Sequence, residues 1–117
     1  MNSLFESLPS ALFEEEITTV FHQDKHIRIE RILSCGQSSP DGFWYDQIED
    51  EWIVLLQGTS TLELETQVIT LQAGDTLFLP KHQKHRIIQT SSQPICIWLC
   101  VFYQEEKPNE TKEIRPH

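Results

Sequence analysis

The sequence has no long apolar run and no basic leader. None of its 117 residues falls in a stretch that approaches the roughly 20 consecutive apolar residues of a transmembrane helix. The first ten residues, MNSLFESLPS, contain no basic region followed by a continuous hydrophobic segment, so no signal peptide is expected. These absences predict a cytoplasmic protein that does not enter the membrane.

Basic residues are scarce. The chain has 9 Lys and Arg against 18 Asp and Glu, which gives a formal net charge of −9. An acidic surface repels phosphate backbones and anionic lipids, so neither a nucleic acid nor a membrane surface is an expected partner. The length fits one domain with one core.

Cysteines are few and form no CxxC pair. Cys96 and Cys100 share a face of the predicted strand 95–103 but lie ~13 Å apart along it, too far to bridge each other. We therefore interpret them, together with Cys35, as small buried hydrophobic residues in a reducing compartment.

Composition separates one domain from a polar tail. Residues 1–103 contain enough apolar side chains for a core, whereas residues 104–117 are polar and predict a disordered tail. Residues 2–15 mix apolar and acidic side chains around Pro9, which predicts a short N-terminal helix or turn.

Short segments with β-forming composition make up most of the domain. Turn residues separate them every eight to twelve positions, a pattern typical of an all-β sandwich or barrel. Two segments, 51–57 and 95–103, are apolar on both faces, so we expect them to be central or covered by a second sheet or subunit, and we predict a homodimer. The predicted strands are 17–22, 26–34, 43–47, 51–57, 60–66, 67–72, 76–80, 85–90 and 95–103.

Polar residues interrupt otherwise apolar strands between residues 43 and 89. Buried polar groups are costly unless they pair with each other, a metal or a ligand. Residues two apart in a strand share a face, so Tyr45 and Gln47 point the same way. If that face is the interior, these two side chains, Glu51 and His85 converge inside a small barrel.

The spacing of these residues resembles the cupin superfamily of double-stranded β-helix barrels. The first cupin motif ends with His-x-His, three or four residues, Glu, six residues and Gly. Glu51 and Gly58 have that spacing, and Tyr45 and Gln47 stand where the two histidines are usual. The resemblance covers about residues 26–103 and is closest to a small single-domain bacterial cupin.

The second cupin motif reads Gly, five residues, Pro-x-Gly, two residues, His, three residues and Asn. Gly74, Pro80 and His85 match it, whereas His82 replaces the glycine and Gln89 replaces the asparagine. This is the most specific part of the resemblance.

The resemblance implies an antiparallel all-β barrel whose interior binds a divalent metal ion (Zn, Fe, Mn or Ni) and a small-molecule ligand. Carried over by position, Gln47, Glu51 and His85 are the expected metal ligands. Tyr45 and His82 are the expected proton donors or acceptors. Cupins include isomerases, dioxygenases and lyases, so the reaction type stays open.

Several alternatives stay open. A different register places Trp44 and Asp46 at the histidine positions, on the opposite face. Glu51 has a purely structural alternative, in which its carboxylate pairs with a donor inside the barrel. His82 has one too, as a residue of an exposed basic loop. A metal-free binding or sensing module, or a structural protein acting through its dimer surface, are the competing functions.

Overall fold

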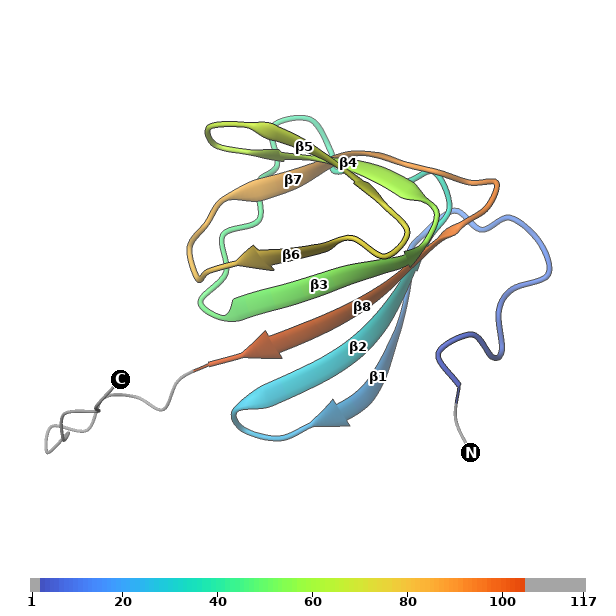
Figure 1. Cartoon of the computed structure of the whole chain (residues 1–117), viewed down its shortest axis with the longest axis horizontal. Helices are drawn as coiled ribbons and strands as arrows, with labels where there is room; N and C mark the ends of the chain where they lie inside the picture. Colours follow the sequence, from blue (N-terminus) through green and yellow to red (C-terminus); the bar gives the residue numbers. More distant parts are fainter. Residues whose placement is uncertain (1–2, 105–117) are drawn as a thin grey trace, which may run out of the picture.

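The computed structural model describes residues 3–104 and consists of two antiparallel β-sheets that face each other and close into a barrel (Figure 1). The larger sheet has the order β1–β2–β8–β3–β6 and the smaller one β5–β4–β7. The predicted antiparallel all-β architecture is confirmed. The strands are β1 (Ile17–Gln23), β2 (Ile27–Ser34), β3 (Asp50–Gln57), β4 (Thr59–Leu64), β5 (Val68–Gln72), β6 (Thr76–Leu79), β7 (His85–Thr90) and β8 (Cys96–Tyr103).

Of the predicted N-terminal helix or turn, the structure has the turn: residues 3–16 form turns and bends and contain no helix. One local prediction needs correction. The predicted strand 43–47 is not a strand; its only ladder contact is an isolated bridge between Tyr45 and His85. The segment follows a Gly- and Pro-containing loop and pairs with β7 only at Tyr45; its Gln47 carbonyl oxygen also accepts a hydrogen bond from the His82 N–H at 2.7 Å, outside any strand.

The core lies between the facing sheets and follows the two-residue period of the strands. β8 is central in the larger sheet, between β2 and β3, and points Cys96, Trp98, Cys100 and Phe102 inward. The three cysteines are free thiols; Cys96 and Cys100 are buried as predicted, whereas Cys35 is only partly buried.

The outer face of the larger sheet is apolar and only partly covered. The N-terminal segment covers one end, where the Arg31 guanidinium donates hydrogen bonds to the carbonyl oxygens of Leu4 and Glu6 at 3.2 and 2.7 Å. Elsewhere on this face Trp52 and Phe78, paired on β3 and β6, remain 37% and 49% exposed. The sequence expectation that both faces of 51–57 are covered is therefore not met within one chain.

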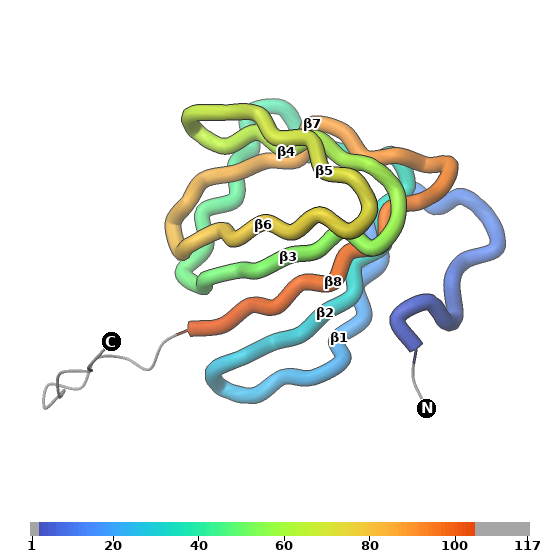
Figure 2. The backbone as a smooth tube through the Cα atoms, viewed as in Figure 1, coloured from blue at the N-terminus to red at the C-terminus, as the bar shows by residue number. Residues whose placement is uncertain are grey.

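Both ends of the described part of the chain, near residues 3 and 104, lie away from the barrel interior (Figure 1). Figure 2 shows the N-terminal segment passing along the end of the barrel where β2 finishes and β8 begins. The predicted disordered tail, 104–117, falls outside the described residues except for Gln104, whose backbone N–H donates to the His26 carbonyl oxygen at 2.9 Å. Within residues 3–104, no helix has the length and hydropathy required to cross a membrane.

Candidate functional site

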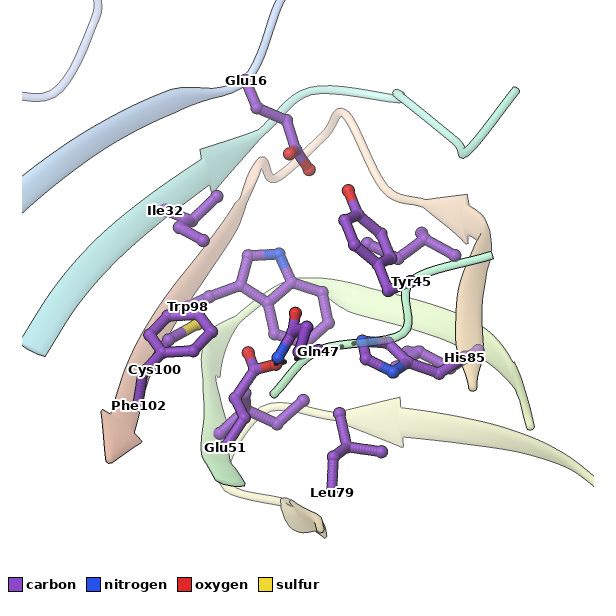
Figure 3. A pocket seen from close by; sticks show the side chains of 13 residues that line it. Glu16, Ile32, Tyr45, Gln47, Glu51, Leu79, His85, Trp98, Cys100 and Phe102 are labelled. Atoms are coloured by element: carbon purple, nitrogen blue, oxygen red, sulfur yellow. Dashed lines mark hydrogen bonds and ion pairs between the residues drawn. The ribbon is translucent and has the colours of Figure 1, made fainter. Parts of the chain in front are cut away.

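A cavity of about 100 Å³ lies inside the barrel, between the two sheets. Most of its wall is apolar, with Ile32, Leu79, Trp98 and Phe102 among the lining residues. Its polar side chains are those of Glu16, Tyr45, Gln47, Glu51 and His85, drawn in Figure 3. The cavity therefore contains every predicted site residue except His82.

Tyr45 reaches the cavity because a backbone bridge attaches its segment to the start of β7. The backbone N–H of Tyr45 donates to the His85 carbonyl oxygen at 2.7 Å, and the backbone N–H of His85 donates to the Tyr45 carbonyl oxygen at 3.1 Å. Directly paired residues share a face, so the two rings stack with centroids 5.1 Å apart and planes 20° apart. The Tyr45 hydroxyl points toward Glu16 and away from Glu51 (Figure 3).

Glu51 supplies a carboxylate that is almost fully removed from water, because only 7% of the residue is exposed. Gln47 Nε2 donates to Glu51 Oε1 at 3.2 Å, so the two side chains pair within the cavity. Desolvation raises the pKa of Glu51 to about 7 and outweighs the hydrogen bonds from Gln47 and Cys100, which lower it. Near neutral pH, this side chain can therefore either hold or release a proton.

His85 presents its Nε2 atom to the cavity, and its hydrogen bonding fixes the tautomer of the ring. Its Nδ1 lies 3.0 Å from the Gln83 carbonyl oxygen; a carbonyl only accepts, so Nδ1 carries the proton. The Nε2 lone pair then faces the cavity, 3.9 Å from Glu51 Oε1. Burial lowers the pKa of His85, which keeps the ring neutral at pH 7.

His82, Trp44 and Asp46 do not line the cavity. His82 is exposed, and its Nδ1 lies 2.8 Å from Asp46 Oδ1. Its backbone has a φ of 63°, the left-handed region that favours glycine, which is the residue expected here in the second motif. That turn and the contact with Asp46 hold the imidazole outside the barrel.

Glu16 is the cavity residue that the sequence reading missed. It belongs to the acidic run 14–16, in which three adjacent glutamates carry no motif that marks one of them as a site residue. Glu16 Oε2 accepts a hydrogen bond from Ser34 Oγ at 2.8 Å, and Ser34 Oγ accepts one from Trp98 Nε1 at 3.1 Å. Only the register of β1 on β2, in which Ile17 pairs with Leu33, brings Glu16 beside Ser34.

The cavity offers three side chains that could hold the divalent metal typical of cupins: His85, Glu51 and Gln47. His85 offers an imidazole whose Nδ1 is held by a carbonyl, as is usual for a metal-ligating histidine. Glu51 offers a carboxylate and Gln47 an amide, a weaker ligand than the imidazole it replaces. Within residues 3–104, no three His, Cys, Asp or Glu side chains are grouped to hold an ion. These residues fit a weak site and do not fit a typical three-histidine cupin centre.

Known proteins place the chain in a family. The family model for the cupin domain matches residues 36–102. A Ralstonia eutropha protein named as a candidate mannose-6-phosphate isomerase is 36% identical, with a TM-score of 0.83 over 90% of this chain and 98% of that one. No curated protein matches significantly.

Two further solved structures share the fold at lower identity. A cupin superfamily protein from Desulfitobacterium hafniense is 20% identical, with a TM-score of 0.73 over 90% of this chain and 92% of that one. The cupin domain of Schizosaccharomyces pombe Cnp3 is 11% identical, with a TM-score of 0.69 over 85% and 68%. At these identities, the likeness concerns the barrel alone. Together with the family match, the closed antiparallel barrel and the placement of Glu51, Gly58, Gly74 and His85, these findings show that the chain belongs to the cupin family.

Proposed function

We propose that this cupin binds a small molecule inside its barrel, at the polar group formed by Gln47, Glu51 and His85. One observation carries the proposal. A buried carboxylate with a pKa of about 7 faces an imidazole nitrogen that makes no hydrogen bond with the residues described. A ligand that donates hydrogen bonds to the His85 Nε2 lone pair and to the Glu51 carboxylate would pair with both groups inside the cavity.

If the cavity supports a reaction, the arrangement favours proton transfer. Glu51 would exchange a proton near neutral pH, and the neutral ring of His85 would accept a hydrogen bond at Nε2. Burial, with the negative charges of Glu16 and Glu51, raises the pKa of Tyr45, so its hydroxyl stays protonated and can donate. We assign no part in this chemistry to His82, because it lies outside the cavity.

A divalent metal ion at the same place is the second candidate. His85 Nε2, a Glu51 oxygen and, after rotation of its amide, Gln47 Oε1 would be the ligands. The hydrogen bond that fixes Nδ1 of His85 favours this assignment. When bound, the ion would act as a Lewis acid toward an oxygen of the ligand.

The substrate suggested by the name of the Ralstonia eutropha relative is not carried over. A sugar phosphate brings a dianion, and enzymes bind phosphate with Arg, Lys or the N-termini of helices. No Lys or Arg within the described chain lines this cavity, and Glu16 and Glu51 would repel a phosphate.

The test combines metal analysis with ligand screening on the full chain. We would purify wild type, Glu51→Gln and His85→Gln without added metal and measure Fe, Mn, Ni and Zn. Stoichiometric metal that is lost in both variants supports the metal candidate, and His82→Ala, which changes an exposed imidazole, should retain it. A fragment screen by NMR then tests the general proposal. If no fragment shifts the signals of Trp98 or Ile53 at millimolar concentration, the pocket is not a ligand site.

We also propose that a second copy of the chain covers the outer face of the larger sheet. The chain carries a net charge of −9, yet the outward residues of the three central strands, β2, β3 and β8, are mostly apolar. No Asp or Glu faces outward within the ranges 27–33, 52–56 and 97–103. Apart from Asp50 and Arg31, whose charges are opposite, the outward side chains of these strands are uncharged, which is compatible with a twofold interface in which each patch meets itself. Light scattering at micromolar concentration tests this, and a monomeric mass contradicts it.

A further inference from the structure

Within the described chain, the ionisable groups that line the barrel cavity include no Lys or Arg. Glu16 and Glu51 are carboxylic acids, and His85 donates its Nδ1–H to the Gln83 carbonyl oxygen, so its Nε2 lone pair faces inward. Figure 3 shows Glu16 at one end of the lining and Glu51 at the other. The cavity therefore presents mainly hydrogen-bond acceptors, and it needs a partner that donates.

The positive charge of Arg28 does not offset the two carboxylates of the cavity. Arg28 lies on the same face of β2 as Ile32, but its Nε is 2.6 Å from Glu30 Oε2 and its guanidinium is 3.0 Å from Glu49. Its charge is thus offset by two carboxylates, and it packs over the ring of Phe102 at 4.2 Å. It does not line the cavity.

Two neutral side chains respond to the negative field inside the barrel. The pKa of the Tyr45 hydroxyl is raised by burial and then by the charges of Glu16 and Glu51. The pKa of the Cys100 thiol is raised by burial and then by Glu51, Glu30 and Glu16. Both shifts agree with the geometry, in which Glu16, just before β1, and Glu51, on β3, line one small cavity.

Glu16 occupies the solvent-facing edge of the cavity, because the residue is exposed whereas Glu51 is buried. Its carboxylate accepts a hydrogen bond from Ser34 Oγ, which in turn accepts one from the indole N–H of Trp98 in the cavity wall. This support fixes the direction of a side chain that would otherwise move freely in water. A positively charged group entering the barrel would meet Glu16 first and Glu51 last.

We propose that the ligand of this cavity is a small organic cation, such as a primary ammonium compound with a short apolar body. Glu51 binds the ammonium group, with His85 Nε2 as a second acceptor, and the apolar body packs against Trp98 and Leu79. Glu16 attracts the cation at the edge of the cavity. This inference rests on the proposed ligand-binding function and names the chemical class of its ligand.

Three probes of similar shape but different charge test the inference. Butylammonium, butanol and butyrate would be titrated into the metal-free full chain at pH 8, with the Trp98 indole N–H followed by NMR. We expect butylammonium to bind about tenfold more tightly than butanol, a difference of about 1.4 kcal/mol, and butyrate to bind most weakly.

Matched variants assign the effect to the two carboxylates. Glu51→Gln should remove the tenfold preference for butylammonium over butanol. Glu16→Gln should reduce butylammonium affinity about threefold, because an exposed ion pair contributes less than a buried one, and should leave butanol binding unchanged. Glu15→Gln, an exposed acid one position earlier that does not line the cavity, is the control and should change neither affinity.

The outcomes separate this inference from the proposed function. If butanol or butyrate binds as tightly as butylammonium, the pocket is a ligand site and the assignment of a cation is wrong. If fragments of every charge fail to perturb Trp98, the proposed function itself fails. A preference for butylammonium that survives both Glu51→Gln and Glu16→Gln would also overturn the inference, because it would place the ion elsewhere.

Discussion

The Nε2 atom of His85 lies 3.9 Å from the Oε1 atom of Glu51, and both side chains are more than nine-tenths buried. The separation is too long for a hydrogen bond, so these two strong polar groups face each other without satisfying each other. They come from different sheets, β7 and β3, and converge because the two sheets close around a common interior. This relationship is the centre of the candidate site.

The first prediction concerns the pH dependence of stability in the metal-free chain. The folded pKa of Glu51, about 7, lies above its ordinary value of 4.5. A raised pKa means that burial favours the protonated form. The contribution of Glu51 to the free energy of unfolding is therefore complete below pH 4.5 and is lost as the pH rises to 7 and beyond. The total loss is about 3 kcal/mol.

Chemical denaturation of wild type and Glu51→Gln across this range measures the effect. The difference between their unfolding free energies should change by about 3 kcal/mol between pH 4 and pH 8. The wild type should become less stable relative to the variant at the higher pH. Glu15→Gln, which changes an exposed acid, should follow the wild type. A constant difference between wild type and Glu51→Gln would show that the carboxyl group is not desolvated.

The second prediction concerns metal affinity. Gln47 stands at a position where cupins usually have histidine, and its amide already contacts Glu51. Gln47→His adds an imidazole beside Glu51 and His85, so we expect Zn²⁺ or Ni²⁺ affinity to rise by at least about tenfold. Competition with a chromophoric chelator measures this. Gln89→His, an exposed position on β7, is the control; an equal gain there would mean that the added histidine binds metal without the cavity.

The third prediction compares two glycines of the family motifs. Gly58 and Gly74 both have a φ of +95°, so alanine should cost about 1–2 kcal/mol of backbone strain at either position. At Gly58 the added Cβ would also lie 2.7 Å from Ser91 Oγ and 3.0 Å from Cys96 Cα, whereas nothing lies within 4 Å at Gly74. Gly58→Ala should therefore destabilise the fold by about 1–3 kcal/mol more than Gly74→Ala. Equal thermal unfolding of the two variants would contradict this.

The fourth prediction tests the outer face as a dimer surface. Trp52 is 37% exposed, so Trp52→Glu should leave the barrel folded while placing two like charges near each other in a twofold interface. We expect the variant to be monomeric by light scattering at concentrations where the wild type is dimeric. Val68→Glu changes a 59% exposed residue on the smaller sheet and should keep the wild-type mass.

Much of the barrel could be predicted from the sequence because β-forming composition and turn residues are local properties of a strand and its ends. The predicted segments 26–34, 51–57, 85–90 and 95–103 correspond closely to β2, β3, β7 and β8. The segment 43–47 has the same β-forming composition but no neighbour along its length, so it forms one bridge instead of a strand. Pairing partners depend on the whole fold, and composition does not report them.

The candidate site was predictable in part for the same reason. Tyr45 and Gln47 were placed together by the two-residue period, and the cavity contains them with Glu51 and His85. His82 was expected as a candidate for catalysis, but a left-handed backbone and a contact with Asp46 hold it outside. Glu16 was not among the expected site residues, because nothing in an acidic run distinguishes one carboxylate from the next.

The sequence by itself determined the all-β class, the family and the strand faces, because alternation and glycine spacing are properties of the chain read residue by residue. Only the tertiary structure decided which polar groups meet. Sheet closure brought Glu51 toward His85, and the register of β1 on β2 brought Glu16 to the edge of the cavity. Desolvation and the electric field depend on distances through space, so the raised pKa of Glu51 and the acidic character of the cavity appear only once the barrel is closed.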